Sequence, residues 1–438
     1  MRSIDETEHI GTAKTAAGEA PDGGEDVSAW IRAQAQARRE DLVRLCAELV
    51  AARSVNPDGD TRAAAEVVRG FLASRGLNPR LERQLEHMPS VLAELDSGQP
   101  GPHLVLNVHL DTMPPGDEST WSVPVWDMIR RDGRLYGLGM GNMKGAVAAM
   151  LHAVDLLAQL RHHWSGRITF TAVSDEVVFG DNGAAFLLRQ HPGLTGNALL
   201  CGEGPGYRRL AVGEKGVLWL EVAATGEAGH SSAVRQGRSA AARIARAATA
   251  IDGLTGLRGT LPPELQGLAG AGLELTANVG VLAAGSFIGQ IATSGRLEVD
   301  LRLPPGITAD AAEDLVRAAI GGDGLTLRRI KGWDANVTDP GDSLVQAWRR
   351  GEVLAGLPAA DLAIRLPASD ASRWRQRGIP ALCYGPQPTL SAGIDDYAVE
   401  DEVVNCAALY ALAALSYLQG NPPQRPSIPA PPLIGDLP

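Results

Sequence analysis

Short apolar runs and longer stretches with helical spacing alternate along the first half of the chain. Leu42, Leu45 and Leu49 recur at the spacing of one helix face, which predicts a long helix over residues 27–52. The other elements predicted in this half are helices over 60–75, 144–159 and 184–190, and strands over 104–109 and 167–173. Alternation of this kind is typical of a mostly parallel sheet covered by helices, so we predict an α/β fold.

From about residue 216 the order of predicted elements changes. The predicted strands cover 217–222, 274–279, 296–302 and 325–330, and the predicted helices cover 239–250 and 308–320. Thr308 precedes the second of these helices and is a candidate N-cap. Four strands with two helices make an α+β unit inserted into the sheet domain. The predicted segments are a disordered N-terminal segment at 1–27, a sheet domain in two parts at 28–212 and 333–420, the insert at 213–332 and a Pro-rich tail at 421–438.

Composition and charge exclude several classes of protein. The 438 residues are 45% hydrophobic, which is enough for two domain cores. The net charge is −11 and no Lys/Arg-rich run occurs, so we expect neither nucleic acid nor a membrane surface as a partner. No run is apolar enough to span a bilayer, and no signal-peptide core is present. The cysteines lie far apart, as is typical of free thiols in the cytoplasm, where we expect this protein: Cys46, Cys201, Cys383 and Cys406.

Residues suited to metal and acid–base chemistry follow several of the apolar runs. His109 ends the strand over 104–109, and Asp111 follows two residues later. Open α/β sheets bind their ligands at the edge where such strands end. An acidic pair that includes Glu176 follows the strand over 167–173 in the same way. The remaining polar positions of interest are Asn142 in Gly-Asn-Met-Lys-Gly, Glu203 in Cys-Gly-Glu-Gly-Pro and His230 in Gly-His-Ser-Ser.

The order and spacing of these motifs resemble the aminoacylase, carboxypeptidase G and succinyl-diaminopimelate desuccinylase family of two-zinc amidohydrolases, over about residues 30–420. The resemblance implies that His109 binds one zinc, that Asp111 orients it, and that Glu203 is another ligand of the same ion. It also implies that Glu176 is the general base and that His230 polarises the scissile carbonyl, from the partner subunit in some members. The insert then corresponds to a ferredoxin-like lid, through which we expect a homodimer.

Other positions carry a second interpretation beside the one that the resemblance implies. Arg302 matches a lid arginine that pairs with a substrate carboxylate, but it also suits a solvated strand surface. Asp370, in Ser-Asp-Ala, matches a loop that lines the site. His230 alternatively belongs to a solvated loop, and Asn142 alternatively caps the helix that follows it.

Three positions depart from the family pattern. The bridging Asp is Asn142, a ligand Glu is Val177, and the last ligand His falls at Gly393. An amide has no charge and cannot bridge two cations as a carboxylate does. The second ion thus loses both of its own ligands, whereas the first keeps His109 and Glu203. We predict at most one divalent metal, zinc by ligand type, held by these two residues and Asn142, or none. The resemblance also predicts a cis peptide bond after Asn142.

The resulting hypotheses differ in the use of a metal. The first is hydrolysis of an amide bond in a small N-acyl amino acid or peptide-like substrate, with a one-metal or metal-poor site. The second is a metal-independent acyl transfer, cyclisation or elimination by Glu176, because the neighbouring Val177 makes its surroundings drier and raises its pKa. The third is an inactive homologue that binds a ligand. The joint presence of the candidate catalytic residues argues against this third hypothesis.

Overall fold

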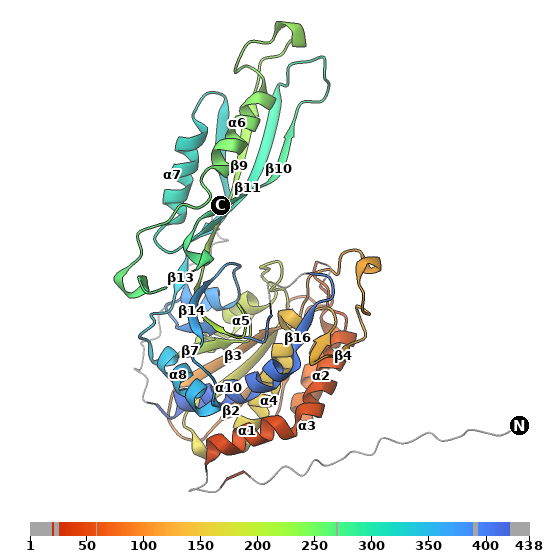
Figure 1. Ribbon diagram of the computed structural model, residues 1–438, viewed down its shortest axis with the longest axis vertical. Coiled ribbons are helices and arrows are strands. Elements are labelled where there is room, and N and C mark those ends of the chain that lie inside the picture. The colour runs from red at the N-terminus through yellow and green to blue at the C-terminus, as the bar shows by residue number, and fades with distance from the viewer. Residues whose placement is uncertain (1–19, 22–25, 58, 269, 389–392, 421–438) are drawn as a thin grey trace, which may run out of the picture.

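The structure is a computed structural model that describes residues 20–21, 26–57, 59–268, 270–388 and 393–420. It consists of a layered domain and an elongated domain that stands on it (Figure 1). Most of the N-terminal segment predicted to be disordered lies outside the described residues, as does the predicted Pro-rich tail. Within the described residues, no helix is long and apolar enough to cross a bilayer.

A nine-stranded sheet forms the centre of the layered domain. Four strands in its middle run parallel to one another, in the spatial order β6, β3, β7 and β15. Antiparallel strands flank them on both sides, so the predicted fold class is confirmed. The strands are β1 (Arg80–Glu82), β2 (Ser90–Asp96), β6 (Arg167–Val173), β3 (His103–His109), β7 (Ala198–Cys201), β15 (Ala381–Cys383), β8 (Arg209–Glu214) and β13 (Asn336–Val337), with β14 (Asp361–Arg365) paired to β8.

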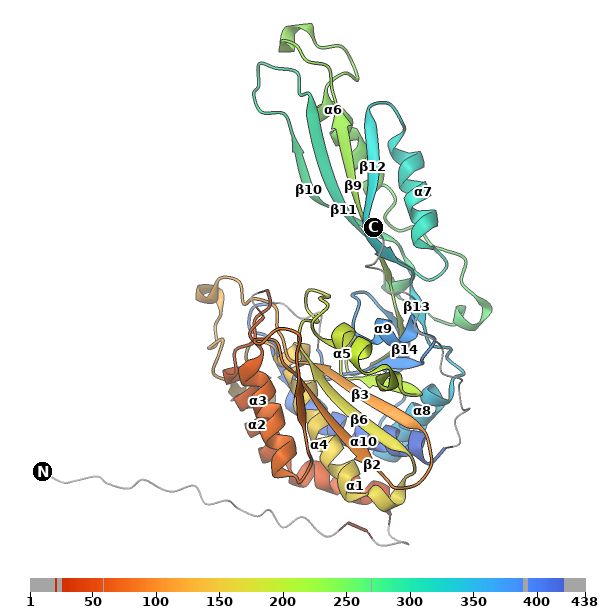
Figure 2. The same ribbon diagram turned by 180° about the vertical axis from the view of Figure 1, so that it is seen from behind.

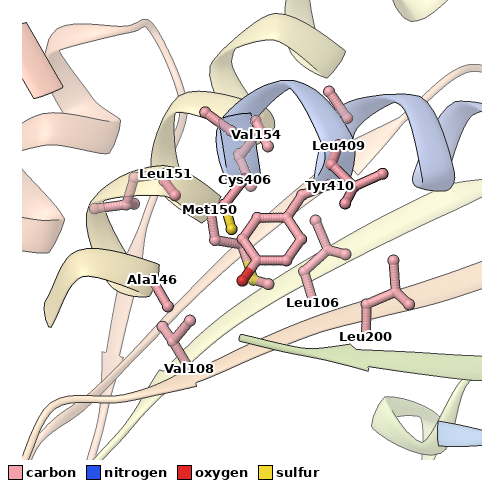
Figure 3. Packing of buried hydrophobic residues seen from close by; sticks show 14 of the residues in the cluster. Leu106, Val108, Ala146, Met150, Leu151, Val154, Leu200, Cys406, Leu409 and Tyr410 are labelled. Carbon is pink, nitrogen blue, oxygen red and sulfur yellow. The ribbon is translucent and has the colours of Figure 1, made fainter. Parts of the chain in front are cut away.

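Helices cover both faces of this sheet (Figures 1 and 2). Successive residues of a strand point to opposite faces. Leu106 and Val108 of β3 accordingly pack with Met150 and Tyr410 on one face (Figure 3), whereas Val105 belongs to the core on the other face. The first face carries α1 (Val27–Ala37), α2 (Arg39–Ala51), α3 (Arg62–Ser74), α4 (Gly145–Gln159), α8 (Ser343–Ala355) and α10 (Glu400–Leu418), and the second carries α5 (Ala184–Gln190) and α9 (Ala371–Arg375). Burial on both faces explains the continuous apolar runs of the sequence.

The single helix predicted over residues 27–52 is wrong, because two helices meet at Arg38. The backbone of Arg38 leaves the helical region, with φ −96° and ψ 14°. Its guanidinium is buried and donates to Asp155 of α4 at 2.5 Å. A buried arginine needs such a partner, and the apolar periodicity that predicted one helix carries no information about it.

The elongated domain is a four-stranded antiparallel sheet with α6 and α7 packed on one face, and it is called the lid below. Its strand order is β10, β11, β9 and β12. Thr308 accepts a hydrogen bond from the backbone N–H of Ala311 at 3.1 Å, so the predicted N-cap is confirmed. The elements are β9 (Gly216–Thr225), α6 (Ala240–Asp252), β10 (Thr276–Ala284), β11 (Ser294–Leu303), α7 (Ala309–Ile320) and β12 (Leu325–Trp333).

Candidate active site

The candidate site lies where the parallel strands β6, β3 and β7 end. The strand register places His109, the last residue of β3, beside Val173, the last residue of β6. Strand β7 lies on the other side of β3, so the segments that follow all three strands meet at one edge of the sheet. His109, Glu176 and Glu203 are buried there, and each offers one ligand atom within 4.8 Å of the other two.

His109 has polar neighbours at both ring nitrogens. Its Nδ1 lies 2.9 Å from the carbonyl oxygen of Asp111 and 3.5 Å from the carboxylate of the same residue. Its Nε2 lies 3.3 Å from Oδ1 of Asn142 and 3.6 Å from Oε2 of Glu176. Burial alone would lower the pKa of His109, but the interactions with Asp111 raise it to about 9. Asp111 thus fixes the ring, and Nε2 faces the other candidate residues.

The carboxylate of Asp111 also positions Glu176. It accepts hydrogen bonds from the backbone N–H groups of Glu176 at 3.2 Å and Val177 at 3.0 Å. Asn56 donates to Asp111 at 2.9 Å and to Asp175 at 3.2 Å, so it joins the two segments. The sequence analysis did not identify Asn56, because an isolated Asn in a loop carries no signal of such a role.

Glu176 lies in surroundings that favour its neutral form. Burial raises its pKa well above the ordinary value, and the negative charges of Asp370 and Asp111 raise it further. Burial likewise raises the pKa of Asp370 to about 6, although Arg373 pairs with it at 3.2 Å and opposes the shift. The negative charge of Asp370 is therefore one cause of the raised pKa of Glu176.

Glu203 carries an ion pair that the sequence analysis did not predict. Its Oε1 accepts a hydrogen bond from the guanidinium of Arg365, and both side chains are buried. Arg365 also donates to the carbonyl oxygens of Ala368 at 2.6 Å and Pro367 at 3.3 Å. Oε2 of Glu203 has no hydrogen-bond partner among the described residues. A signal was available, because Arg365 ends an apolar strand just as His109 does.

Asn142 lies in the glycine-rich loop before α4. The peptide bond after it is cis, as predicted. The N-cap position of α4 is Lys144, with no side-chain cap, so the interpretation of Asn142 as a helix cap is wrong. Asp396 holds this loop, because it accepts hydrogen bonds from the N–H groups of Gly139 at 2.8 Å and Gly141 at 3.1 Å.

The structure does not bring three of the predicted positions together with these residues. His230 follows β9, which begins at Gly216 beside the layered domain and extends about 30 Å at ~3.3 Å per residue. His230 is exposed, and its ring lies 2.9 Å from Oγ of Ser232. Arg302 lies near the base of the lid and donates to Asp300 on its own strand at 2.9 Å. Gly393 is exposed, and a Cβ atom there would meet no described atom within 4 Å.

The donor set fits one divalent cation. An imidazole nitrogen, carboxylate oxygens and an amide oxygen converge at the site, and the unpartnered Oε2 of Glu203 is free to bind an ion. Imidazole and carboxylate are ordinary zinc ligands. Among the described residues, His109, Glu176 and Glu203 are the one group found that could hold an ion, and Val177 beside Glu176 offers no donor atom.

Comparison with known proteins relates the chain to one peptidase family. Residues 105–416 match peptidase family M20/M25/M40. A succinyl-diaminopimelate desuccinylase of Rhodospirillum centenum is 31% identical over 202 residues, which cover 44% of this chain and 51% of that protein. The corresponding protein of Bradyrhizobium sp. (strain ORS 278) is 40% identical over 95 residues, which cover 21% of this chain and 24% of that protein. The chain spans about half the length, or less, of these curated relatives.

Solved structures of low sequence identity share the fold. The di-peptidase Dug1p of Saccharomyces cerevisiae has a TM-score of 0.70 at 11% identity, covering 90% of this chain and 99% of that one. The M20 family metallo-carboxypeptidase Sso-CP2 of Sulfolobus solfataricus has a TM-score of 0.68 at 16% identity, covering 86% and 99%. Because the family match extends over most of the chain, from β3 to α10, this protein is a member of peptidase family M20/M25/M40.

Proposed function

We propose that this protein hydrolyses the amide bond of a small N-acyl amino acid or peptide-like substrate, with at most one divalent cation, zinc by donor chemistry, at His109, Glu203 and Asn142. The observation that carries the proposal is the convergence of His109, Glu176 and Glu203 at the ends of adjacent parallel strands. Family membership supports the reaction type. The four cysteines are free and buried, which suits the reducing cytoplasm.

Each side chain of the site has a part in this proposal. A cation there would supply Lewis-acid activation of water and of the amide carbonyl. Glu176 takes the proton of the attacking water and passes it to the leaving amine, and its raised pKa brings it nearer to the working pH. Asp111 holds both the ring of His109 and the backbone of Glu176 in place. Asp370 lines the site beside Glu176, and Arg302 pairs with a substrate carboxylate when the lid approaches.

A homodimer completes the site in this proposal. His230 stands at the far end of the lid and cannot reach His109 of its own chain without a large movement. His230 of the partner subunit would stabilise the oxyanion instead. The exposed edge strand β10 and the loop after it support such pairing, since Leu282 is 52% exposed and Ile288 is 94% exposed. Light scattering at micromolar concentration tests this, and a monomer would contradict it.

A metal analysis combined with an amidase assay tests the proposed reaction. The protein is dialysed, its zinc content is measured, and it is assayed against a panel of N-acyl amino acids and dipeptides. We expect hydrolysis of at least one substrate and no more than one zinc per chain. Two tightly held zinc ions, or no hydrolysis across the panel with zinc supplied, would contradict the proposal.

A metal-independent reaction is the second candidate. Two observations favour it. The pKa of Glu176 is raised, and Glu203 is already paired with the positively charged guanidinium of Arg365. Acyl transfer, cyclisation or elimination by Glu176 would then persist when a chelator removes the metal. Full activity in excess chelator would favour this candidate, and loss of activity restored by zinc would favour the first.

A further inference from the structure

Arg365 is a buried arginine in direct contact with a candidate metal ligand. It comes from the end of β14, which pairs with β8 and not with the strands that carry His109 and Glu203. Its side chain is 4% exposed, and its hydrogen bonds go to Glu203 and to the two backbone carbonyls named above. A buried guanidinium with these partners is held in one position.

Three buried acidic groups of this region are paired with arginine side chains. Asp370 pairs with Arg373 at 3.2 Å, and Glu203 pairs with Arg365. Behind them, Glu214 pairs with the buried Arg375 at 3.3 Å. At these three carboxylates, the negative charge that would attract a divalent cation is therefore offset in part by the chain's own arginines.

We propose that the guanidinium of Arg365 is a built-in cation of the active site, which orients Glu203 and weakens the binding of a divalent ion there. Arg365 is thus a positioning residue that acts through Glu203. One carboxylate oxygen accepts a hydrogen bond from the arginine, and the other is buried and has no hydrogen-bond partner among the described residues. A fixed positive charge next to a ligand oxygen repels a divalent cation and withdraws charge from that ligand. This inference rests on the proposed function, because it assumes that Glu203 is a metal ligand.

Zinc affinity of charge-altered variants tests this inference. Arg365→Gln and Arg365→Met remove the charge, and Arg365→Lys keeps it. Arg38→Gln is the matched control, because it breaks a similarly buried ion pair with Asp155, a residue of the last turns of α4, whereas the candidate site lies before the first turn of that helix. The full-length apo proteins are checked by circular dichroism and titrated with zinc against a chromogenic chelator.

We expect the Gln and Met variants to bind zinc at least about tenfold more tightly than the unaltered protein, because one repulsive charge is gone. The Lys variant and Arg38→Gln should bind as the unaltered protein does. Unchanged or weaker binding by a folded Gln or Met variant, or no binding by any protein, would overturn the inference. Either folded variant decides the question. Amidase activity of the unaltered protein is measured in parallel, so failure of the proposed reaction is seen separately from failure of the inference.

Discussion

The two halves of the metal site that the family resemblance predicts differ in their surroundings as well as in their ligands. His109 and Glu203 lie at strand ends, are each 2% exposed, and share hydrogen bonds with other buried groups. Val177 is half-buried in the turn after β6, and Gly393 is exposed. Loss of a buried polar group leaves its partners unsatisfied, whereas an exposed position can change at little cost. The residues of the first half therefore stabilise the fold through their buried contacts, whereas those of the second half can be substituted at little cost in stability.

Replacement of the candidate base Glu176 should have the largest effect of all on catalytic activity. Glu176→Gln keeps the size of the side chain but cannot take a proton, so we expect kcat to fall by about 10²–10⁴-fold. The measurement is a steady-state amidase assay with the best substrate of the panel. Zinc titration of the same variant is the control for an intact site. Activity within tenfold of the unaltered protein would mean that another group is the base.

The Arg365–Glu203 pair should contribute strongly to the stability of the first half. Arg365→Met leaves a carboxylate buried without its partner, so we expect a loss of about 3–5 kcal/mol in unfolding free energy by urea denaturation. Removal of both charges, with Glu203→Met added, should restore much of the loss. The exposed Arg62–Asp60 pair is the control, because solvent screens it and Arg62→Met should change stability little. Equal effects at the two pairs would contradict the structural argument.

Restoration of the ligands that the second half lacks should raise the number of metal ions bound per chain. The triple variant Asn142→Asp, Val177→Glu and Gly393→His supplies a bridging carboxylate and two further ligands. We expect two zinc ions per chain by elemental analysis after dialysis, against at most one in the unaltered protein. The single variant Val177→Glu is the control and should gain no second ion. If the triple variant folds and gains none, the assignment of Gly393 is the first to discard.

Local patterns in the sequence predict part of the fold and of the candidate site, but not the contacts between distant segments. Strand and helix periods predict the parallel sheet, and the residues that end those strands predict His109, Glu176 and Glu203, because strand ends meet at one edge. Arg365 and Asn56 were missed, since their contacts with Glu203 and Asp111 join segments far apart in the sequence. The position of Arg365 at the end of a strand marks it as a candidate, but no local pattern names Glu203 as its partner.

Asp370 should make stability depend on pH in the acid range. Its pKa is about 6 in the folded protein against an ordinary value of 3.8, so the folded state binds this proton more tightly. Its contribution is fully present below pH 3.8 and is lost as pH rises to about 6, by about 2–3 kcal/mol. An asparagine side chain does not titrate in this range. Relative to Asp370→Asn, the unaltered protein should therefore lose those ~2–3 kcal/mol of unfolding free energy between about pH 4 and 6.5. Urea denaturation at several pH values measures this, and parallel pH profiles would contradict it.

The smallest expected effect compares one glycine from each half. A Cβ atom at Gly202, next to Glu203, would lie 3.0 Å from side-chain atoms of both Met143 and Val108, whereas one at Gly393 would meet no described atom within 4 Å. Gly202→Ala should therefore lower the unfolding free energy by about 1–3 kcal/mol through overpacking. Gly393→Ala should change it by less than about 0.5 kcal/mol, as exposed substitutions do. Urea denaturation of both variants measures the difference, and equal losses would show that the second half is packed as firmly as the first.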